Sequence, residues 1–333
     1  MVERGHDVTV FCRTTHYEQR LSSHLGMKLV YLPALREKHL ETLSHTAFSA
    51  FRLPRGAAIV CMGVGNAPVV RLLEAQGRRS VYNVDGTDWQ REKWGRFARW
   101  YLRTCESLAA RGRSIIVADA KAVQDYYASA YGRESELVVY GADAPKDDGT
   151  ATLERFGLRT AEYLLWVGRL VPENAAGDFL EGVRLSGIAA PAVVVGDADY
   201  AEDYKSRLRA QAPANAVFTG YQFGAAYQQL TSHAGLYVLA ASIGGTHPVL
   251  VEQMAAGNAI LARETDSNCE VLGDAGLYWK TTAELGRLLS EVWPDAQRRQ
   301  ALGQAARERA ARIYSWDQVT SRYLELCERS LLR

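Results

Sequence analysis

Short apolar runs rich in Val and Ile alternate with helix-like patterns along the whole chain. Continuous apolar runs of this length are typical of strands buried on both faces, as in parallel sheets. They predict strands at residues 7–12, 27–32, 58–62, 80–84, 114–118, 137–140, 163–167, 192–195, 216–219, 236–239, 259–262 and 276–279. Helices are predicted between them, for example at residues 94–111, 123–131, 201–212 and 247–256. This alternation predicts an α/β fold built from doubly wound parallel sheets.

A polar stretch with Pro and Gly at residues 144–149 separates two such strand–helix series. A chain of 333 residues is long enough for about two domains. We therefore predict a Rossmann-like N-terminal domain at residues 1–145 and a second one at residues 146–312. The pattern at residues 296–332 predicts helices broken near Ser315, and we expect residues 313–333 to pack back on the N-terminal domain.

The composition is that of a folded globular protein, with 47% hydrophobic and 23% charged residues. No apolar run approaches the ~18 residues that cross a bilayer, and the charged start has no apolar signal region, so we expect a cytoplasmic protein. The five scattered cysteines indicate reduced thiols rather than disulfides or a zinc site.

The charge is unevenly distributed. Residues 1–145 contain 20 Lys and Arg against 15 Asp and Glu, whereas the rest contains 19 against 23. A basic half attracts anions such as phosphorylated ligands or anionic lipid. The chain lacks the dense basic stripe or recognisable module of nucleic-acid-binding proteins, so we expect no nucleic-acid partner.

Candidate chemistry is concentrated after the predicted strand at residues 236–239. Gly244 and Gly245 form a flexible turn, Thr246 can cap the following helix, and Pro248 suits its first turn. A helix N-terminus placed after a strand and a glycine turn is a ready anion site. Glu252, about a turn and a half into the helix, could accept hydrogen bonds from ribose hydroxyls. Alternatively, Glu252 is solvated and the glycines only turn the chain.

This segment resembles the donor-site signature of family-4 glycosyltransferases of GT-B fold, especially the rhamnosyltransferase-like subgroup. The pattern S-x-G-G-T-x-P-x-L-x-E-x-M-A-x-G runs from Ser242 to Gly257, and N-x-E-V-L-G and Leu277-Tyr278 follow it. The resemblance implies a GT-B fold and donor binding by Gly244, Gly245, Thr246 and Glu252, with Glu252 on the ribose. Broader relatives have a second glutamate where Gly244 stands here, but the subgroup also has glycine there.

A second match follows the predicted strand at residues 163–167. In the family, the Gly-Arg pair that stands here as Gly168-Arg169 belongs to the donor site, and its arginine faces the nucleotide diphosphate. A guanidinium can pair with two phosphate oxygens and stabilise the charge on the leaving group. Broader relatives add a lysine nearby, where this chain and the subgroup have Glu173-Asn174. The alternative is a surface Arg-Glu pair.

The N-terminal half contains the acceptor-side candidates. Residues 83–94 resemble the subgroup element N-x-D-G-x-x-W-x-R-x-K-W. The resemblance implies that Asp85 lies beside the transferred sugar, as a catalytic residue, and that Arg91 and Lys93 could hold an acceptor phosphate. Asp85 could equally form a turn and the two cations could be solvated. Asn66, in the glycine loop after the strand at residues 58–62, is a further candidate acceptor contact.

The helix at residues 94–111 carries an aromatic stripe of Trp94, Phe97 and Tyr101 beside Arg96, Arg99 and Arg103. Such a helix could rest on a membrane or accept a lipid-linked substrate. More often, the aromatic side chains belong to the core and the arginines face water. Asp197-Ala198-Asp199 matches the metal motif of the other major glycosyltransferase fold, but we interpret this match as chance and expect no metal site.

The resemblance implies a retaining, metal-independent glycosyltransferase that uses no cofactor. It would transfer rhamnose or a similar hexose from a nucleoside diphosphate to a saccharide or lipid-linked acceptor, in polysaccharide or cell-envelope glycan synthesis. We expect it in the cytoplasm, with peripheral contact at the inner face of the membrane. The alternatives are a non-catalytic nucleotide-sugar-binding module and a nucleotide-sugar epimerase, although the acid/base set of an epimerase is not recognisable.

The start of the chain also resembles an internal segment of the family. In relatives, a pattern L-x-E-R-G-H-x-V-T-V ends the first helix, and here the matching residues are 1–10. The resemblance implies that the first strand–loop–helix unit of the N-terminal domain is missing. A misplaced start codon or a genuinely shortened, impaired protein would explain this.

Overall fold

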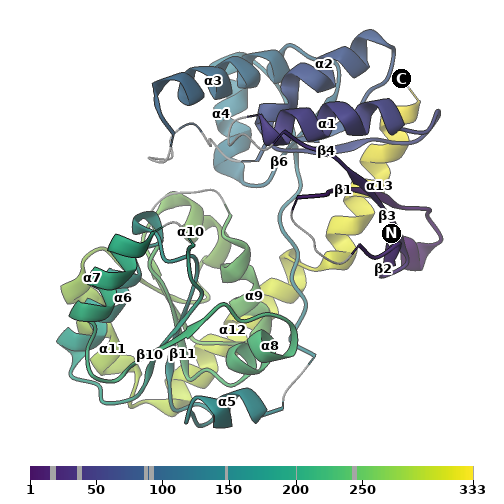
Figure 1. Ribbon diagram of the computed structural model, residues 1–333. Helices are drawn as coiled ribbons and strands as arrows, with labels where there is room; N and C mark the ends of the chain where they lie inside the picture. The colour runs from purple at the N-terminus through teal and green to yellow at the C-terminus, as the bar shows by residue number, and fades with distance from the viewer. Residues whose placement is uncertain are drawn as a thin grey trace. The chain divides into compact units, whose positions relative to one another are not determined.

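The chain folds into two compact units (Figure 1). The computed structural model describes residues 1–15, 20–35, 40–85, 89, 94–146, 149–199, 201–241 and 246–332. The first unit comprises Met1–Val139 and Val319–Arg333, and the second comprises Tyr140–Gln318. The division between them therefore lies a few residues before the predicted boundary at residue 145, and the end of the chain groups with the first unit.

The second unit is built on one six-stranded sheet in the order β10-β9-β8-β11-β12-β13. Every neighbouring pair of strands is parallel. Its strands are β8 (Leu164–Val167), β9 (Ala192–Val195), β10 (Ala216–Gly220), β11 (Leu236–Leu239), β12 (Ile260–Arg263) and β13 (Leu277–Trp279). Its helices are α5 (Ala151–Arg155), η4 (Pro172–Asn174), α6 (Ala176–Ser186), α7 (Glu202–Gln211), α8 (Gly224–Ser232), α9 (Pro248–Ala256), α10 (Asp266–Leu272), α11 (Thr282–Val292) and α12 (Ala296–Ile313).

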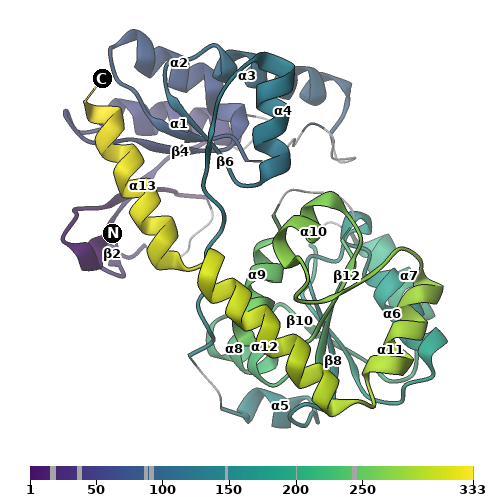
Figure 2. The same cartoon turned by 180° about the vertical axis from the view of Figure 1, so that it is seen from behind.

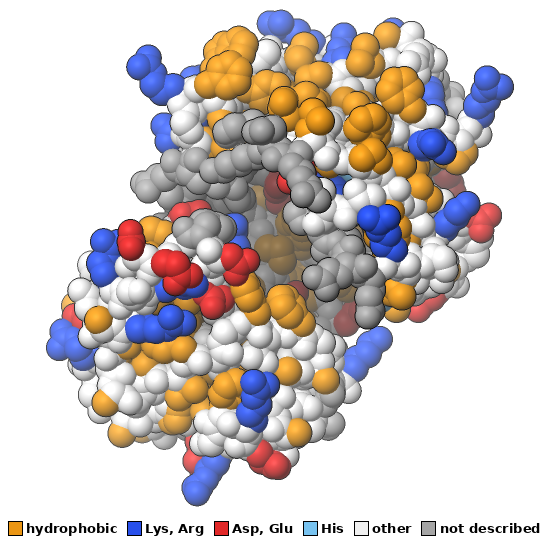
Figure 3. Space-filling view, in the orientation of Figure 1, with side chains coloured by type: hydrophobic (Ala, Val, Ile, Leu, Met, Phe, Trp, Pro, Cys, Tyr) orange, Lys and Arg blue, Asp and Glu red, His pale blue; other side chains and the backbone are white. Residues whose placement is uncertain are grey.

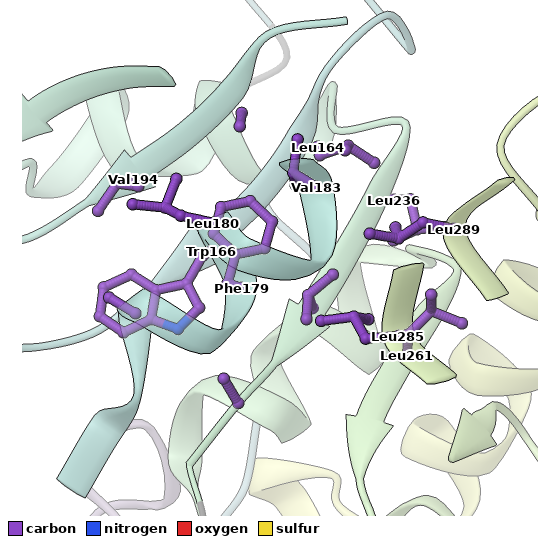
Figure 4. Close-up of a cluster of buried hydrophobic side chains, with 14 of the residues drawn as sticks. Leu164, Trp166, Phe179, Leu180, Val183, Val194, Leu236, Leu261, Leu285 and Leu289 are labelled. Carbon is purple, nitrogen blue, oxygen red and sulfur yellow. The ribbon is translucent and has the colours of Figure 1, made fainter. Parts of the chain in front are cut away.

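Helices bury both faces of this sheet because its strands are apolar on both sides. Leu164 and Trp166 of β8 point to the face covered by α6 and α11, where they meet Phe179 and Leu285 (Figure 4). Leu165, between them, is also completely buried, as expected for a central parallel strand. β8 is therefore buried on both faces at the centre of the second unit.

Among its described residues, the first unit contains two separate sheets. One has the order β1-β3-β2, with β1 and β3 parallel, and the other has the order β4-β5-β6-β7, entirely parallel. Their strands are β1 (Thr9–Arg13), β2 (Ser23–His24), β3 (Met27–Leu32), β4 (Val60–Met62), β5 (Val81–Asn83), β6 (Ile115–Ala118) and β7 (Glu136–Leu137). The helices are η1 (Val2–Arg4), α1 (Glu41–Arg52), η2 (Val64–Asn66), α2 (Ala67–Ala75), α3 (Arg96–Ala110), α4 (Lys121–Tyr131) and α13 (Trp316–Leu331).

The last helix, α13, belongs to the first unit over most of its length. It runs alongside the strands of that unit (Figure 2). Val319, Tyr323 and Leu326 pack on Val81 of β5 and Val117 of β6. The C-terminal helix thus covers the four-stranded sheet, although it is far from the strands of that sheet in the sequence.

The predicted α/β fold of two units with parallel sheets is confirmed. Every strand predicted from an apolar run is present within a few residues of its predicted bounds, and the short antiparallel β2 is additional. The break predicted near Ser315 separates α12 from α13. All five cysteines are free.

Phe179→Ala tests the core of the second unit. Phe179 is fully buried between α6 and the sheet, so truncation should lower the free energy of unfolding by about 3–5 kcal/mol. Phe223→Ala is the matched control, since Phe223 is 79% exposed in the same unit, and it should cost no more than about 0.5 kcal/mol. Urea unfolding measures both; equal losses would contradict the assignment of the core.

Candidate functional site

The centre of the second sheet brings two of the predicted motifs to one edge. β8 and β11 pair in parallel through Leu164↔Leu236 and Leu165↔Tyr237. The strand order runs outward from β8 to β10 on one side and from β11 to β13 on the other, so the order reverses between β8 and β11. Ligands of doubly wound folds bind outside the carboxyl ends of the strands at such a reversal. Gly168-Arg169 follows β8 directly, and Thr246 and α9 follow β11.

Backbone hydrogen bonds tie the loop after β8 to the end of β9 and to the loop that follows β9. The Gly168 N–H donates to the Val195 carbonyl at 3.0 Å, and the Leu170 N–H donates to the Asp197 carbonyl at 3.2 Å. The Asn174 side-chain amide donates to the Arg169 carbonyl at 2.9 Å. Asn174 therefore shapes the turn, in the segment where broader relatives have a lysine and this chain has Glu173-Asn174. The Arg169 side chain is exposed in this turn.

Gly196, at the end of β9, is required by this arrangement. Its φ of 124° lies in a region that side chains rarely adopt, and an added Cβ would lie 2.0 Å from the Gly168 carbonyl oxygen. The sequence analysis did not identify Gly196, because a single glycine after a strand carries no motif. Its role is to let the β8 and β9 loops approach each other.

The helix after β11 begins one residue later than a Thr246 cap requires. α9 starts at Pro248, its N-cap residue is His247, and the His247 side chain makes no capping hydrogen bond. The prediction that Thr246 caps the helix is therefore wrong; Thr246 is a buried residue that precedes the cap. With no side-chain cap, N–H groups of the first turn remain suited to an anion. The predicted donor residues Gly244 and Gly245 lie outside the described residues.

Two side chains that the sequence analysis did not assign to the site hold the segment that follows β11. Arg263, at the end of β12, donates from Nε to the Ala240 carbonyl at 2.8 Å, and its guanidinium also pairs with Asp178. Asn268 donates from Nδ2 to the Ala241 carbonyl at 3.4 Å and to the Arg263 carbonyl at 2.8 Å. Asn268 belongs to the quoted signature, whereas nothing in the sequence distinguishes Arg263.

Other positions of the signature shape the backbone. Gly273 adopts φ 57° and ψ −131°, a conformation essentially restricted to glycine, and its carbonyl accepts a hydrogen bond from the Tyr278 hydroxyl. Gly257 ends α9 in the left-handed region, at φ 79°. The match at Gly257, Gly273 and Tyr278 is therefore explained by folding rather than by ligand contact.

Glu252 is half-buried on α9 and has a specific partner. The Tyr227 hydroxyl of α8 donates to Glu252 Oε2 at 2.5 Å. Burial, with the Glu252 carboxylate second, raises the pKa of Tyr227 well above its usual value, so Tyr227 stays a neutral donor. The Glu252 side chain is thus oriented by a hydrogen bond within the protein and is not freely solvated.

In the first unit, Asp85 follows β5 in a strained conformation. Its φ is 59°, a left-handed value that Asp tolerates better than most residues. The Asp85 N–H donates to Asn83 Oδ1 at 2.8 Å, and the Asn83 amide donates to the Tyr323 hydroxyl of α13 at 2.9 Å. Asn83 and Tyr323 therefore fix the backbone at Asp85.

Asp85 also lines a pocket of about 340 Å³, together with residues 63–65, Leu43, Phe97 and Tyr101. The Tyr101 hydroxyl donates to the Gly65 carbonyl at 2.8 Å. Most of the lining side chains are apolar, so the pocket suits a ligand with an apolar part.

Asn66, another acceptor-side candidate, does not line this pocket. Asn66 is only 4% exposed and donates to the Met62 carbonyl at 2.8 Å, so it is an internal residue at the start of α2. Arg91 and Lys93 lie outside the part of the chain that the structure describes. Asp197, of the Asp-Ala-Asp match, accepts a hydrogen bond from Lys205 at 2.8 Å.

The predicted aromatic stripe is divided: Trp94 and Tyr101 are partly buried and pack against the core of the first unit, whereas Phe97 of α3 faces outward. Phe97 is 73% exposed and Trp100, which the predicted stripe did not include, is 62% exposed; the buried face is formed by residues such as Leu102 and Cys105. Hydrophobic side chains gather on the face of the first unit over α1, α2 and α3 (Figure 3). Across the described residues, no helix is both long and apolar enough to cross a membrane.

Two family models match consecutive parts of the chain. A glycosyl transferase 4-like domain matches residues 1–143, and glycosyl transferases group 1 matches residues 161–293. The chain belongs to the GT-B glycosyltransferases. The resemblance to this class is thus confirmed, whereas the rhamnosyltransferase subgroup stays a prediction.

Solved glycosyltransferases have the same fold. Sucrose-phosphate synthase from Thermosynechococcus elongatus is similar with a TM-score of 0.78 at 17% identity, covering 98% of this chain and 90% of that one. Anabaena HepE in complex with UDP-glucose gives 0.74 at 18% identity, over 90% and 85%. WaaG, a glycosyltransferase involved in lipopolysaccharide biosynthesis, gives 0.70 at 15%, over 97% and 91%. No curated protein sequence matches the chain.

Gly196→Ala tests the approach of the two loops in this glycosyltransferase. The clash with the Gly168 carbonyl should lower the free energy of unfolding by about 2–4 kcal/mol. Gly187→Ala is the control: Gly187 also has a positive φ, 70°, but open space around it, so only about 1 kcal/mol of strain is expected. If chemical unfolding gives the two variants equal stability, the close approach at Gly196 is not what requires glycine.

Proposed function

We propose that the chain transfers rhamnose or a similar hexose from a nucleoside diphosphate donor to a saccharide or lipid-linked acceptor. The transfer retains the anomeric configuration, needs no metal or cofactor, and serves polysaccharide or cell-envelope glycan synthesis. The observation that carries the proposal is the meeting of the Gly168-Arg169 loop and the start of α9 at the reversal of the second sheet. The UDP-glucose in the HepE structure supports a nucleotide sugar as donor.

The donor diphosphate is assigned to two positive features at this edge. The Arg169 guanidinium can pair with two phosphate oxygens, and the N-terminus of α9 contributes its dipole and backbone N–H groups. Both stabilise charge that grows on the diphosphate as the sugar departs. Gly244, Gly245 and Thr246 complete the phosphate loop in this proposal, and Glu252 accepts from the ribose.

The acceptor is assigned to the first unit. Asp85, at the rim of the apolar pocket, is the proposed catalytic residue there, with Arg91 and Lys93 as phosphate contacts and Asn66 supporting the loop. The exposed Phe97 and Trp100, next to arginines on α3, support peripheral contact with the cytoplasmic face of a membrane and a lipid-linked acceptor.

One observation favours a second candidate, a nucleotide-sugar-binding module without transfer activity. β1 and β4 each stand at the edge of a separate sheet, and Val60 and Met62 of β4 are 40% and 55% exposed although parallel strands are normally covered. We propose that a further parallel strand between β1 and β4 completes the first unit in the active enzyme. A form of the chain that lacks this strand would bind nucleotide but transfer poorly.

A screen of radiolabelled nucleotide sugars, run on this chain and on an N-terminally extended form, separates the candidates. Transfer from dTDP-rhamnose to lipid or saccharide acceptors supports the full proposal, and transfer from another donor replaces only the rhamnose assignment. Nucleotide binding without transfer in either form favours the binding module. Conversion of the donor sugar without an acceptor would indicate an epimerase.

Arg169→Ala tests the diphosphate assignment. Loss of one group that stabilises the leaving charge should lower kcat by about 100- to 1000-fold, because the effect is largest in the transition state. Arg159→Ala removes a strongly exposed arginine of the same unit and should leave kcat unchanged. Initial rates at saturating donor measure both variants; similar rates for Arg169→Ala and wild type would exclude the assignment.

A further inference from the structure

The carboxylate of Glu252 belongs to a hydrogen-bonded group of side chains between α8 and α9. The Asn258 amide donates to the Gln253 side-chain carbonyl at 2.7 Å and to the Thr231 carbonyl at 2.9 Å. The Gln253 amide donates to the Thr231 hydroxyl at 3.3 Å. Gln253, Thr231 and Asn258 are all buried, so their orientations are fixed by these bonds.

Tyr227 connects this buried group to Glu252. The side chains of Thr231 and Gln253 lie beside the Tyr227 hydroxyl, and that hydroxyl donates to Glu252 Oε2. Tyr237 of β11, fully buried beneath them, also lies close enough to interact with Tyr227 and Glu252. One carboxylate oxygen is therefore held by a protein donor, while Oε1 keeps its lone pairs for another partner.

We propose that Tyr227 is a positioning residue for nucleotide binding, which holds the Glu252 carboxylate so that it can accept hydrogen bonds from the ribose hydroxyls. The inference rests on the proposed function, in which Glu252 is the ribose contact. A carboxylate on a glutamate side chain has several rotamers, and fixing one before the ligand arrives removes an entropic cost of binding. The sequence distance between Tyr227 and Glu252 explains why no motif includes Tyr227.

The neutral state of Tyr227 agrees with this role. Burial and the adjacent carboxylate both raise the pKa of Tyr227, so the hydroxyl remains protonated across the range in which enzymes operate. A protonated phenol donates its single hydrogen to Oε2, so the lone pairs of Oε1 remain available to the ribose. The Tyr227–Glu252 bond therefore orders the carboxylate without removing its capacity to accept.

The test compares Tyr227→Phe with wild type in binding UDP or dTDP, whichever binds more tightly, and an analogue without sugar hydroxyls. That analogue is 2′,3′-dideoxy-UDP for UDP and 3′-deoxy-dTDP for dTDP, whose only sugar hydroxyl is at the 3′ position. We expect Tyr227→Phe to weaken binding of the parent nucleotide about tenfold, the effect of one hydrogen bond. Binding of the dideoxy analogue should not change, because it has no ribose hydroxyl for Glu252 to accept from. In donor kinetics the variant should raise KM and leave kcat nearly unchanged.

Tyr163→Phe is the matched control. The Tyr163 hydroxyl is also buried and donates to the Leu230 carbonyl of α8 at 2.6 Å, so this variant removes an equivalent hydroxyl that touches the same helix. It should change neither affinity. If Tyr227→Phe weakens both nucleotides equally, or weakens neither, Tyr227 contributes only packing and the proposal is overturned.

Glu252→Gln separates this inference from the proposed function. If Glu252→Gln weakens the parent nucleotide selectively and Tyr227→Phe does not, the ribose role of Glu252 stands and the positioning role of Tyr227 fails. If Glu252→Gln has no effect while nucleotide still binds, the assignment of Glu252 itself is wrong. Absence of any nucleotide binding by the wild-type chain would overturn both.

Discussion

The pairing of β8 with β11 is the constraint on which the donor site depends. Because the two strands are parallel neighbours, the loops that follow them leave the same edge of the sheet. Because the strand order reverses there, no crossover helix covers the edge between them. Motifs about 75 residues apart in the sequence thus follow paired strands at the same edge of the sheet, where we propose that Arg169 and Glu252 bind the donor.

The loops at this edge share a pattern in how their polar groups are satisfied. Side chains from other elements bind their carbonyl groups: Asn174 binds that of Arg169, Arg263 binds that of Ala240, and Asn268 binds that of Ala241. Oxygens that are already bonded do not project freely toward a phosphate, whereas the helix N-terminus has no side-chain cap. These carbonyl groups at this edge are hydrogen-bonded within the protein, whereas N–H groups of the first turn of α9 have no side-chain cap. This arrangement favours an anionic ligand.

Sequence patterns predicted the strands because a buried parallel strand needs a continuous apolar run, as at β9 and β11. They identified Arg169 and Glu252 as candidate donor residues because both lie in compact local motifs, and these two assignments stay predictions. The Thr246 cap was wrong because Pro248 fits the first helical position, which makes His247 the N-cap. Tyr227, Gly196 and Tyr323 were not predictable, since their partners are distant in sequence and each contact exists only after the helices and loops have packed.

Because the strands of the first unit are divided between two sheets, we expect this unit to unfold locally more easily than the second. Its two sheets are short, β1 contains no fully buried residue, and α1 buries none either, whereas the second unit has one continuous sheet with a fully buried centre. The free energy needed to open a region locally is lower where the region has fewer buried apolar contacts. Amide hydrogens of β1, β3 and β4 should therefore exchange with solvent long before those of β8 and β11.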